Sequence, residues 1–190
     1  MIARMSLRLA VLTLVFAPLA LACRAASPPA EPVATTAGED ALSEAVSEAV
    51  AELVAEANAV ADAINEMLDD WHQAASKADG ARYFGHMAED AVFLGTDATE
   101  RWTLAEFRAY CEPYFSKGVG WTYERRMRHV QVRDDVAWFD ERLWNDKYGE
   151  CRGTGVVRRD AGEWKLVHYS LTMPIPNELA ADVVKMIRGG

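Results

Sequence analysis

Residues 136–146 read VAWFDERLWND, a stretch in which large apolar and charged side chains are interleaved. Side chains of an extended strand alternate between the two faces of a sheet. One face of this strand would carry Trp138, Asp140, Arg142 and Trp144, and the other would carry Ala137, Phe139, Glu141 and Leu143. Both faces mix apolar groups with charge. A carboxylate between two indoles loses solvation unless a partner compensates for it, so Asp140 is the first candidate for a functional group.

Three further strands are expected beside this one, because turn sequences bound the neighbouring segments. They span residues 120–132, 151–159 and 163–173. Gly153 and Gly155 lie inside the second of these segments, where glycine allows a sheet to bend. Four long strands joined by short turns predict an antiparallel sheet.

Helices precede these strands. Apolar or small residues recur at steps of three and four from Val50 to Trp71, which predicts a long helix over about residues 40–77. A short helix is expected over 81–87, and a third starts near Leu104 behind a capping box. Helices followed by a run of strands predict an α+β domain with a curved antiparallel sheet wrapped around three helices.

The ends of the chain differ in composition from this domain. The expected division is a signal peptide over 1–22, a disordered tether over 23–38, a helical extension over 39–63, the α+β domain over 64–177, and a C-terminal helix and tail over 178–190. The tether is rich in Pro, Ala and Thr without an apolar period. Asn177 is the expected cap of the last helix.

The first 22 residues are typical of a bacterial export signal, because two arginines precede a short apolar run. Residues 19–23 (LALAC) resemble a lipobox, which predicts lipidation of Cys23 and a periplasmic, membrane-anchored protein. Cleavage after Ala22 by ordinary signal peptidase is the alternative and would give a soluble secreted protein. Any membrane contact is expected through the lipid alone, since the chain is acidic.

Composition excludes several classes of function. The formal charge of −9 argues against a nucleic-acid surface, which needs a basic stripe. The sequence has no P-loop, dinucleotide fingerprint or zinc-type spacing of Cys and His, so neither a cofactor nor a metal is expected. Export would place Cys111 and Cys151 in an oxidising compartment, where they form either a disulfide or two separate buried thiols.

Four stretches in this order resemble the SnoaL-like branch of the nuclear transport factor 2-like superfamily. They are FLGTDATERW (93–102), VAWFDE (136–141), YGECRGTGVVRR (148–159) and EWKLVHYSLTMPIPN (163–177). The resemblance covers roughly residues 64–177. It implies a cone-shaped domain whose curved sheet and three helices enclose a deep pocket. It also implies dimers that form through the outer face of the sheet.

The resemblance assigns the face with Trp138 and Asp140 to the pocket. The expected lining is Trp71, Tyr83, Trp102, Phe107, Tyr110, Trp121, Tyr123, Trp138, Arg152, Tyr169 and Leu171. Asp140 is either a general base whose pKa burial raises, or the partner of Arg152 in a buried ion pair that fixes strand register. Asp97 and Glu100 rim the entrance, chelate a cation, or act as turn and cap residues that hold Trp102 in place. Arg126 and Arg128 are expected on a solvated face of the sheet.

Three functions fit this sequence. The first is an exported domain that binds a small apolar or aromatic organic molecule in an enclosed pocket. The second is a cofactor-independent isomerase, cyclase or dehydratase that transfers protons through Asp140, as ketosteroid isomerases or polyketide cyclases do. The third is a non-catalytic dimeric interaction module. The expected partners are a small-molecule ligand and a second copy of the chain, without nucleic acid.

Overall fold

The computed structural model of the protein describes residues 37–189. The predicted signal peptide, the lipidation site Cys23 and the predicted tether up to residue 36 lie outside the described residues. The chain divides into two units, 1–42 and 43–190. Of the first unit only residues 37–42 are described, and they are helical. The fold described below belongs to the second unit.

Three helices precede or interrupt the sheet: α1 (Ala37–Ser76), α2 (Gly80–Gly85) and α3 (Leu104–Phe115). The capping box before α3 forms as the sequence predicts, because Thr103 and Glu106 each accept a hydrogen bond from the backbone amide of the other. Ile64 is the first fully buried residue of α1, so the predicted apolar seam packs on the domain only in its C-terminal half.

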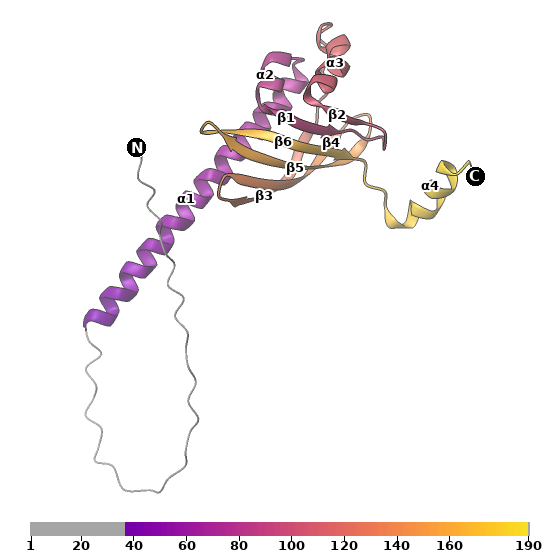
Figure 1. Cartoon of the computed structure of the whole chain (residues 1–190). Coiled ribbons are helices and arrows are strands. Elements are labelled where there is room, and N and C mark those ends of the chain that lie inside the picture. The colour runs from indigo at the N-terminus through magenta and orange to yellow at the C-terminus, as the bar shows by residue number, and fades with distance from the viewer. Residues whose placement is uncertain (1–36, 190) are drawn as a thin grey trace, which may run out of the picture. The chain divides into compact units, whose positions relative to one another are not determined.

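The sheet has six strands in the order β2-β1-β6-β5-β4-β3 and curves around the helices (Figure 1). They are β1 (Met87–Leu94), β2 (Arg101–Thr103), β3 (Glu124–Arg133), β4 (Val136–Asn145), β5 (Gly149–Asp160) and β6 (Glu163–Thr172). All neighbours pair antiparallel except β1 and β6, which run parallel. The predicted α+β class and wrapped sheet are confirmed, and the shorter strands β1 and β2 precede the four long ones.

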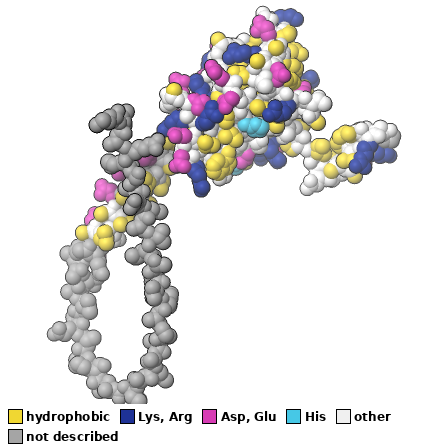
Figure 2. Space-filling model, viewed as in Figure 1, with side chains coloured by type: hydrophobic (Ala, Val, Ile, Leu, Met, Phe, Trp, Pro, Cys, Tyr) yellow, Lys and Arg dark blue, Asp and Glu magenta, His cyan; other side chains and the backbone are white. Residues whose placement is uncertain are grey.

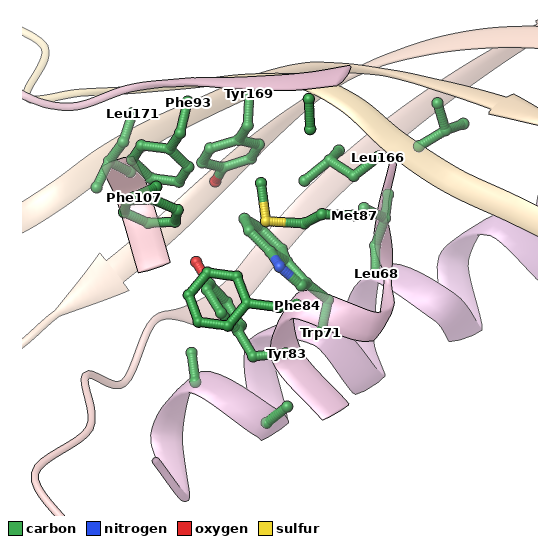
Figure 3. Close-up of a cluster of buried hydrophobic side chains, with 14 of the residues drawn as sticks. Leu68, Trp71, Tyr83, Phe84, Met87, Phe93, Phe107, Leu166, Tyr169 and Leu171 are labelled. Carbon is green, nitrogen blue, oxygen red and sulfur yellow. The ribbon is translucent and has the colours of Figure 1, made fainter. Parts of the chain in front are cut away.

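The hydrophobic core lies between the concave face of the sheet and the helices. Phe93, Tyr169 and Leu171 extend from the sheet toward Trp71 and Tyr83 of the helical layer (Figure 3). The C-terminal half of α1 also contributes Ile64, Leu68, Ala74 and Ala75 to this core.

The faces of β4 are the reverse of those assigned above. Ala137, Phe139, Glu141 and Leu143 are buried against the helices. Trp138 is 42% exposed and the side chain of Asp140 is 58% exposed, so both lie on the outer face. The placement of Asp140 inside the domain is therefore wrong. The physical reason is that Glu141, unlike Asp140, meets buried partners that compensate for its lost solvation.

Two bulges shift the alternation of the neighbouring strands. The register of β3 against β4 slips between Arg125 and Met127, and that of β5 against β6 slips at Val156 and Val157. An extra residue in a strand moves every later side chain to the opposite face. Beyond the first slip the side chain of Arg128 is fully buried, which corrects the solvated position expected for it.

The chain ends in a short 3-10 helix, η1 (Asn177–Leu179), followed by α4 (Ala180–Ile187). Asn177 caps neither helix, because Pro176 precedes η1 and Leu179 precedes α4 without a side-chain hydrogen bond. No residue of α4 is buried, and its apolar and basic side chains lie at the surface (Figure 2). Within the described part of the chain, no helix combines the length and the apolar character needed to cross a membrane.

Candidate functional site

A cavity of about 640 Å³ lies between the sheet and the helices. Its lining includes nine of the residues predicted from the sequence: Trp71, Tyr83, Trp102, Phe107, Tyr110, Trp121, Tyr123, Tyr169 and Leu171. They come from all three helices, from β2 and β6, and from the segment before β3. The structure therefore brings together most of the aromatic residues that the sequence suggested, around one hollow.

Three of the predicted site residues lie outside this cavity. Trp138, Asp140 and Arg152 are exposed on the outer face of the sheet. Asp140 pairs with Thr154 in the strand register, and the single polar partner of its side chain among residues 37–189 is His129, at 3.4 Å. The ion pair expected between Asp140 and Arg152 is absent from the described chain, and Asp140 has neither the burial nor the position that a general base in the pocket requires.

The inner wall of the cavity consists of stacked aromatic rings. Phe93 and Phe107 stack with ring centroids 4.0 Å apart, and Trp71 and Tyr83 stack at 5.1 Å (Figure 3). The first pair joins β1 to α3 across the core, and the second joins α1 to α2 within the helical layer. Flat apolar surfaces of this kind favour a planar ligand that stacks on them.

The mouth of the cavity is formed by loops and by half-exposed tyrosines. Tyr110, Tyr114 and Tyr148 each line the cavity and remain exposed to solvent. Asn145 holds the β4–β5 loop, because its side chain accepts hydrogen bonds from the amides of Lys147 and Tyr148, each at 3.0 Å. The cavity therefore opens to water at this end.

A buried carboxylate lies directly behind the cavity wall. Oε1 of Glu141 accepts hydrogen bonds from Nε2 of His72 and from the hydroxyl of Tyr169, each at 2.8 Å. Oε2 accepts one from Nε of Arg128 at 2.8 Å. His72 and Tyr169 both line the cavity, so a single layer of side chains separates Glu141 from the cavity.

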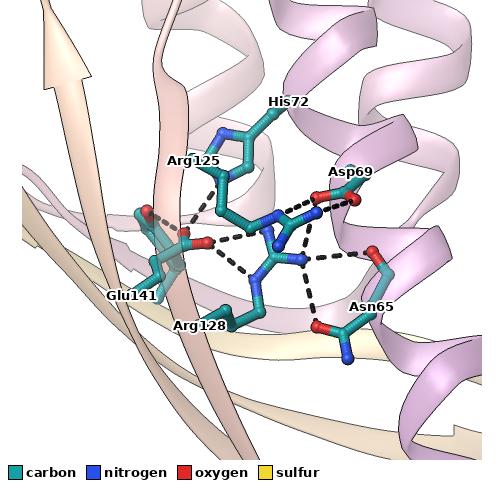
Figure 4. A network of polar contacts seen from close by, with 7 residues as sticks. Asn65, Asp69, His72, Arg125, Arg128 and Glu141 are labelled. Carbon is teal, nitrogen blue, oxygen red and sulfur yellow. Dashed lines mark hydrogen bonds and ion pairs between the residues drawn. The ribbon is translucent and has the colours of Figure 1, made fainter.

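The same network ties the sheet to α1 (Figure 4). Arg128 also donates to Oδ1 of Asp69 at 2.9 Å and to the backbone carbonyl of Asn65 at 3.1 Å. Arg125 donates to both carboxylate oxygens of Asp69, at 2.8 and 2.9 Å. Charges of alternating sign therefore run from the buried Glu141 out to the solvent, and none of them lacks a partner.

The environment fixes the protonation of these groups. Burial raises the pKa of Glu141, but His72, Arg128 and Tyr169 outweigh that effect and lower the pKa to about 2. Burial, with the charge of Glu141, raises the pKa of Tyr169 well above its usual value. Burial likewise raises the pKa of Tyr83. Glu141 is thus an anion that only accepts hydrogen bonds, and the phenols are neutral donors.

This assignment settles the tautomer of His72. Because Glu141 is an acceptor, Nε2 of His72 carries the proton of that hydrogen bond. Nδ1 has no hydrogen-bond partner in residues 37–189. His72, Arg128 and Glu141 were not predicted as site residues. The position of Glu141 on the same strand face as Ala137 and Leu143 was the signal in the sequence that could have indicated its burial.

Gly153 makes room for this network. A Cβ at Gly153 would overlap the hydroxyl of Tyr169 and lie 2.7 Å from Oε1 of Glu141. The glycine that the sequence suggested for sheet bending therefore also has a packing role, because a side chain there would push the two hydrogen-bonded groups apart.

Neither cysteine is part of the site. Cys111 and Cys151 are free, buried thiols, which is the second of the two alternatives left open by the sequence. Burial raises the pKa of Cys111 to about 12, so the thiol is unreactive at neutral pH. Over residues 37–189, no group of three or more His, Cys, Asp or Glu side chains is arranged as metal ligands would be.

The family model of the SnoaL-like domain matches residues 64–176. The chain belongs to the SnoaL-like domain family. The matched range holds the whole sheet, α2, α3 and the buried half of α1. No curated protein sequence matches the SnoaL-like chain.

Solved structures with the same fold have little sequence in common with this SnoaL-like protein. An NTF2-like protein of unknown function from Pseudomonas putida KT2440 is 20% identical, with a TM-score of 0.55 over 64% of this chain and 91% of that one. An NTF2-like protein from Cytophaga hutchinsonii is 16% identical, with a TM-score of 0.51 over 60% and 97%. A Mycobacterium tuberculosis protein of unknown function is 16% identical, with a TM-score of 0.54 over 70% and 88%. These similarities show the NTF2-like fold alone.

Substitutions at Glu141 and at its neighbour Asp140 test whether the buried carboxylate stabilises the fold. We expect Glu141→Gln to lower the free energy of unfolding by about 3 kcal/mol at neutral pH, because it leaves Arg128 buried without its anion. Asp140→Asn, the neighbour on the outer face, should change it by less than about 0.5 kcal/mol. Urea denaturation of the two variants measures both.

The pH dependence of the same variants gives an independent check. The pKa of Glu141 is about 2 in the folded protein against an ordinary 4.5, so its contribution is complete above pH 4.5. That contribution is lost as the pH falls from about 4.5 to about 2. The difference in stability between the native protein and Glu141→Gln should shrink over that window, and a difference that stays constant would contradict the burial of a charged Glu141.

Proposed function

We propose that this SnoaL-like domain binds a small, flat organic molecule that is apolar or aromatic. The observation that carries the proposal is the cavity of about 640 Å³ with its stacked aromatic wall. Small-molecule sites are typically hollows of this size, mostly apolar, with a few placed polar groups. Here the polar groups of the inner wall are His72 and the tyrosine hydroxyls.

The size of the hollow favours this function over that of a pure interaction module. An interaction module needs no internal space, and a packed protein interior has few voids larger than a water molecule. The aromatic rings surround the hollow and leave it open, since Trp102, Trp121 and Tyr123 stand at its wall.

Binding can be tested with a neutral probe. Naphthylmethanol should bind with a Kd on the order of 0.1 mM, a value expected for a ligand of about a dozen non-hydrogen atoms in an aromatic site. Trp102→Ala should weaken binding at least about fivefold, because the indole stacks on Tyr110 at 4.7 Å and lines the cavity. Titration calorimetry provides the measurement.

Trp138→Ala is the matched control for this experiment, since it removes an indole from the outer face. Its Kd for naphthylmethanol should equal that of the native protein. No detectable binding to the native protein at millimolar probe, or equal loss in both variants, would refute the proposal.

A second candidate function is proton transfer, and the hydrogen bond between His72 and Glu141 favours it. A carboxylate that holds Nε2–H of a histidine leaves Nδ1 as a base, which is the arrangement of many general-base histidines. Nδ1 would take a proton from the carbon beside a carbonyl, leaving an enolate and an imidazolium. Burial raises the pKa of Tyr83 and of Tyr123, so both hydroxyls stay protonated and are available to donate to the enolate oxygen.

Hydrogen exchange in deuterated water tests this candidate. The protein should speed deuterium incorporation at the carbon beside the carbonyl of tetralone, an aromatic ketone, as followed by proton NMR. His72→Gln should reduce the rate at least about 100-fold in a protein that still binds naphthylmethanol, and Asp140→Asn should have no effect. A native rate equal to that of buffer, or an unaffected His72→Gln, would leave binding as the function.

We further propose that the protein forms a homodimer through the outer face of its sheet. The support is the half-exposed apolar side chains of that face, Val136 and Trp138 near the start of β4 and Met127 near the start of β3. Export and a lipid anchor on Cys23 are part of the proposal and are supported by the sequence of the first 23 residues.

Sedimentation velocity tests the dimer with the chain lacking residues 1–23. The native protein should sediment as a dimer at micromolar concentration, and Trp138→Lys should shift it to the monomer, because a buried charge opposes association. Ile187→Lys, on the exposed α4, is the control and should leave the dimer intact. A monomeric native protein would contradict this interface.

A further inference from the structure

Carboxylates outnumber lysines and arginines among the side chains that line the cavity. Its titratable wall groups other than tyrosine are His72, Glu100, Asp146 and Lys147. No arginine lines the cavity in the described part of the chain, and the chain as a whole carries a formal charge of −9. A bound anion would therefore meet two carboxylates and one amine at the mouth of a negatively charged protein.

Glu100 is the carboxylate placed best to meet a ligand. It is half-buried in the wall, beside Trp102, and both side chains border the space over Gly95. Its Oε2 accepts a hydrogen bond from the amide of Asp97 at 3.1 Å, which fixes its direction. No Lys, Arg or His nitrogen lies within 4 Å of it among residues 37–189.

The rings beside Glu100 present the faces to which cations bind. Trp102 and Tyr110 stack at 4.7 Å, and Tyr114 continues the row at 5.9 Å from Tyr110. Burial raises the pKa of Tyr110, and Tyr114 and Glu100 add to the rise, so this phenol stays neutral. Aromatic faces attract ammonium groups, most strongly where water is partly excluded.

A contact between a cation and an aromatic ring is already present elsewhere at the mouth, in the β4–β5 loop. The ammonium of Lys147 lies 4.8 Å from the ring centroid of Tyr148. Asp146 next to it accepts a hydrogen bond from the indole of Trp144 at 3.2 Å and forms no ion pair within the described chain. The single basic group of the mouth is thus already placed over a ring, which leaves the two carboxylates uncompensated.

We propose that the ligand of this cavity is an aromatic or apolar amine whose ammonium group sits between Glu100 and the faces of Trp102 and Tyr110. Its apolar body fills the inner cavity. This inference rests on the proposed binding function and adds the charge class of the ligand. It predicts discrimination against carboxylic acids of the same shape, because the mouth offers them no free cation.

Three naphthalene probes of equal size and different charge test this inference by titration calorimetry at pH 7. Naphthylmethylamine should bind about tenfold more tightly than naphthylmethanol, and naphthoate should bind more weakly than the alcohol. Glu100→Gln should bring the amine to within about twofold of the alcohol, with both probes measured on that variant. Glu89→Gln, an exposed acid on β1, is the control for loss of one negative charge and should keep the preference.

The outcomes separate this inference from the binding function. If the alcohol binds but the amine binds no more tightly, the charge class is wrong and the binding function stands. If the preference for the amine survives in Glu100→Gln, it arises from the net charge of the chain, and the assigned ammonium site is wrong. If no probe binds, the binding function fails, and the charge class of its ligand fails with it.

Discussion

The structure depends on one buried anion and on the groups that keep it charged. Glu141 lies where apolar side chains surround it, and it stays ionised because Arg128, His72 and Tyr169 converge on its two oxygens. Those three residues belong to β3, α1 and β6. One carboxylate therefore fixes the position of the long helix against three strands. A hydrophobic residue of the same size would fill the space without fixing any of these directions.

The order of elements and the aromatic lining could be predicted from the sequence, because both follow from local spacing. The seam of α1, the capping box at Thr103 and the alternation of the long strands are patterns within a few residues. The inner face of β4 could not be predicted in this way. Which face of β4 is buried depends on the partners of Glu141. These are His72, Arg128 and Tyr169, which lie 69, 13 and 28 residues away in the chain.

A bulge explains the wrong prediction for Arg128. Strict alternation places Arg128 outside, yet a one-residue slip after Arg125 turns it inward. A second slip, in the pairing of β5 with β6, lets Leu166 and Tyr169 share the buried face although they are three residues apart. Both slips bring a polar side chain to Glu141. The irregularities of the sheet are thus what assembles the network, and a sequence pattern of period two cannot show them.

The mouth of the cavity is built differently from its floor. Ion pairs and stacked rings stabilise the floor. The rim consists of two short connections, Gly95–Glu100 and Asn145–Tyr148. Backbone hydrogen bonds and side-chain caps within these connections fix their conformation. Asp97, Ala98 and Thr99 of the first connection and Asp146 to Tyr148 of the second contribute nothing to the hydrophobic core. Under the proposed binding function, exchanges at these rim positions would change ligand preference while the core beneath keeps its packing.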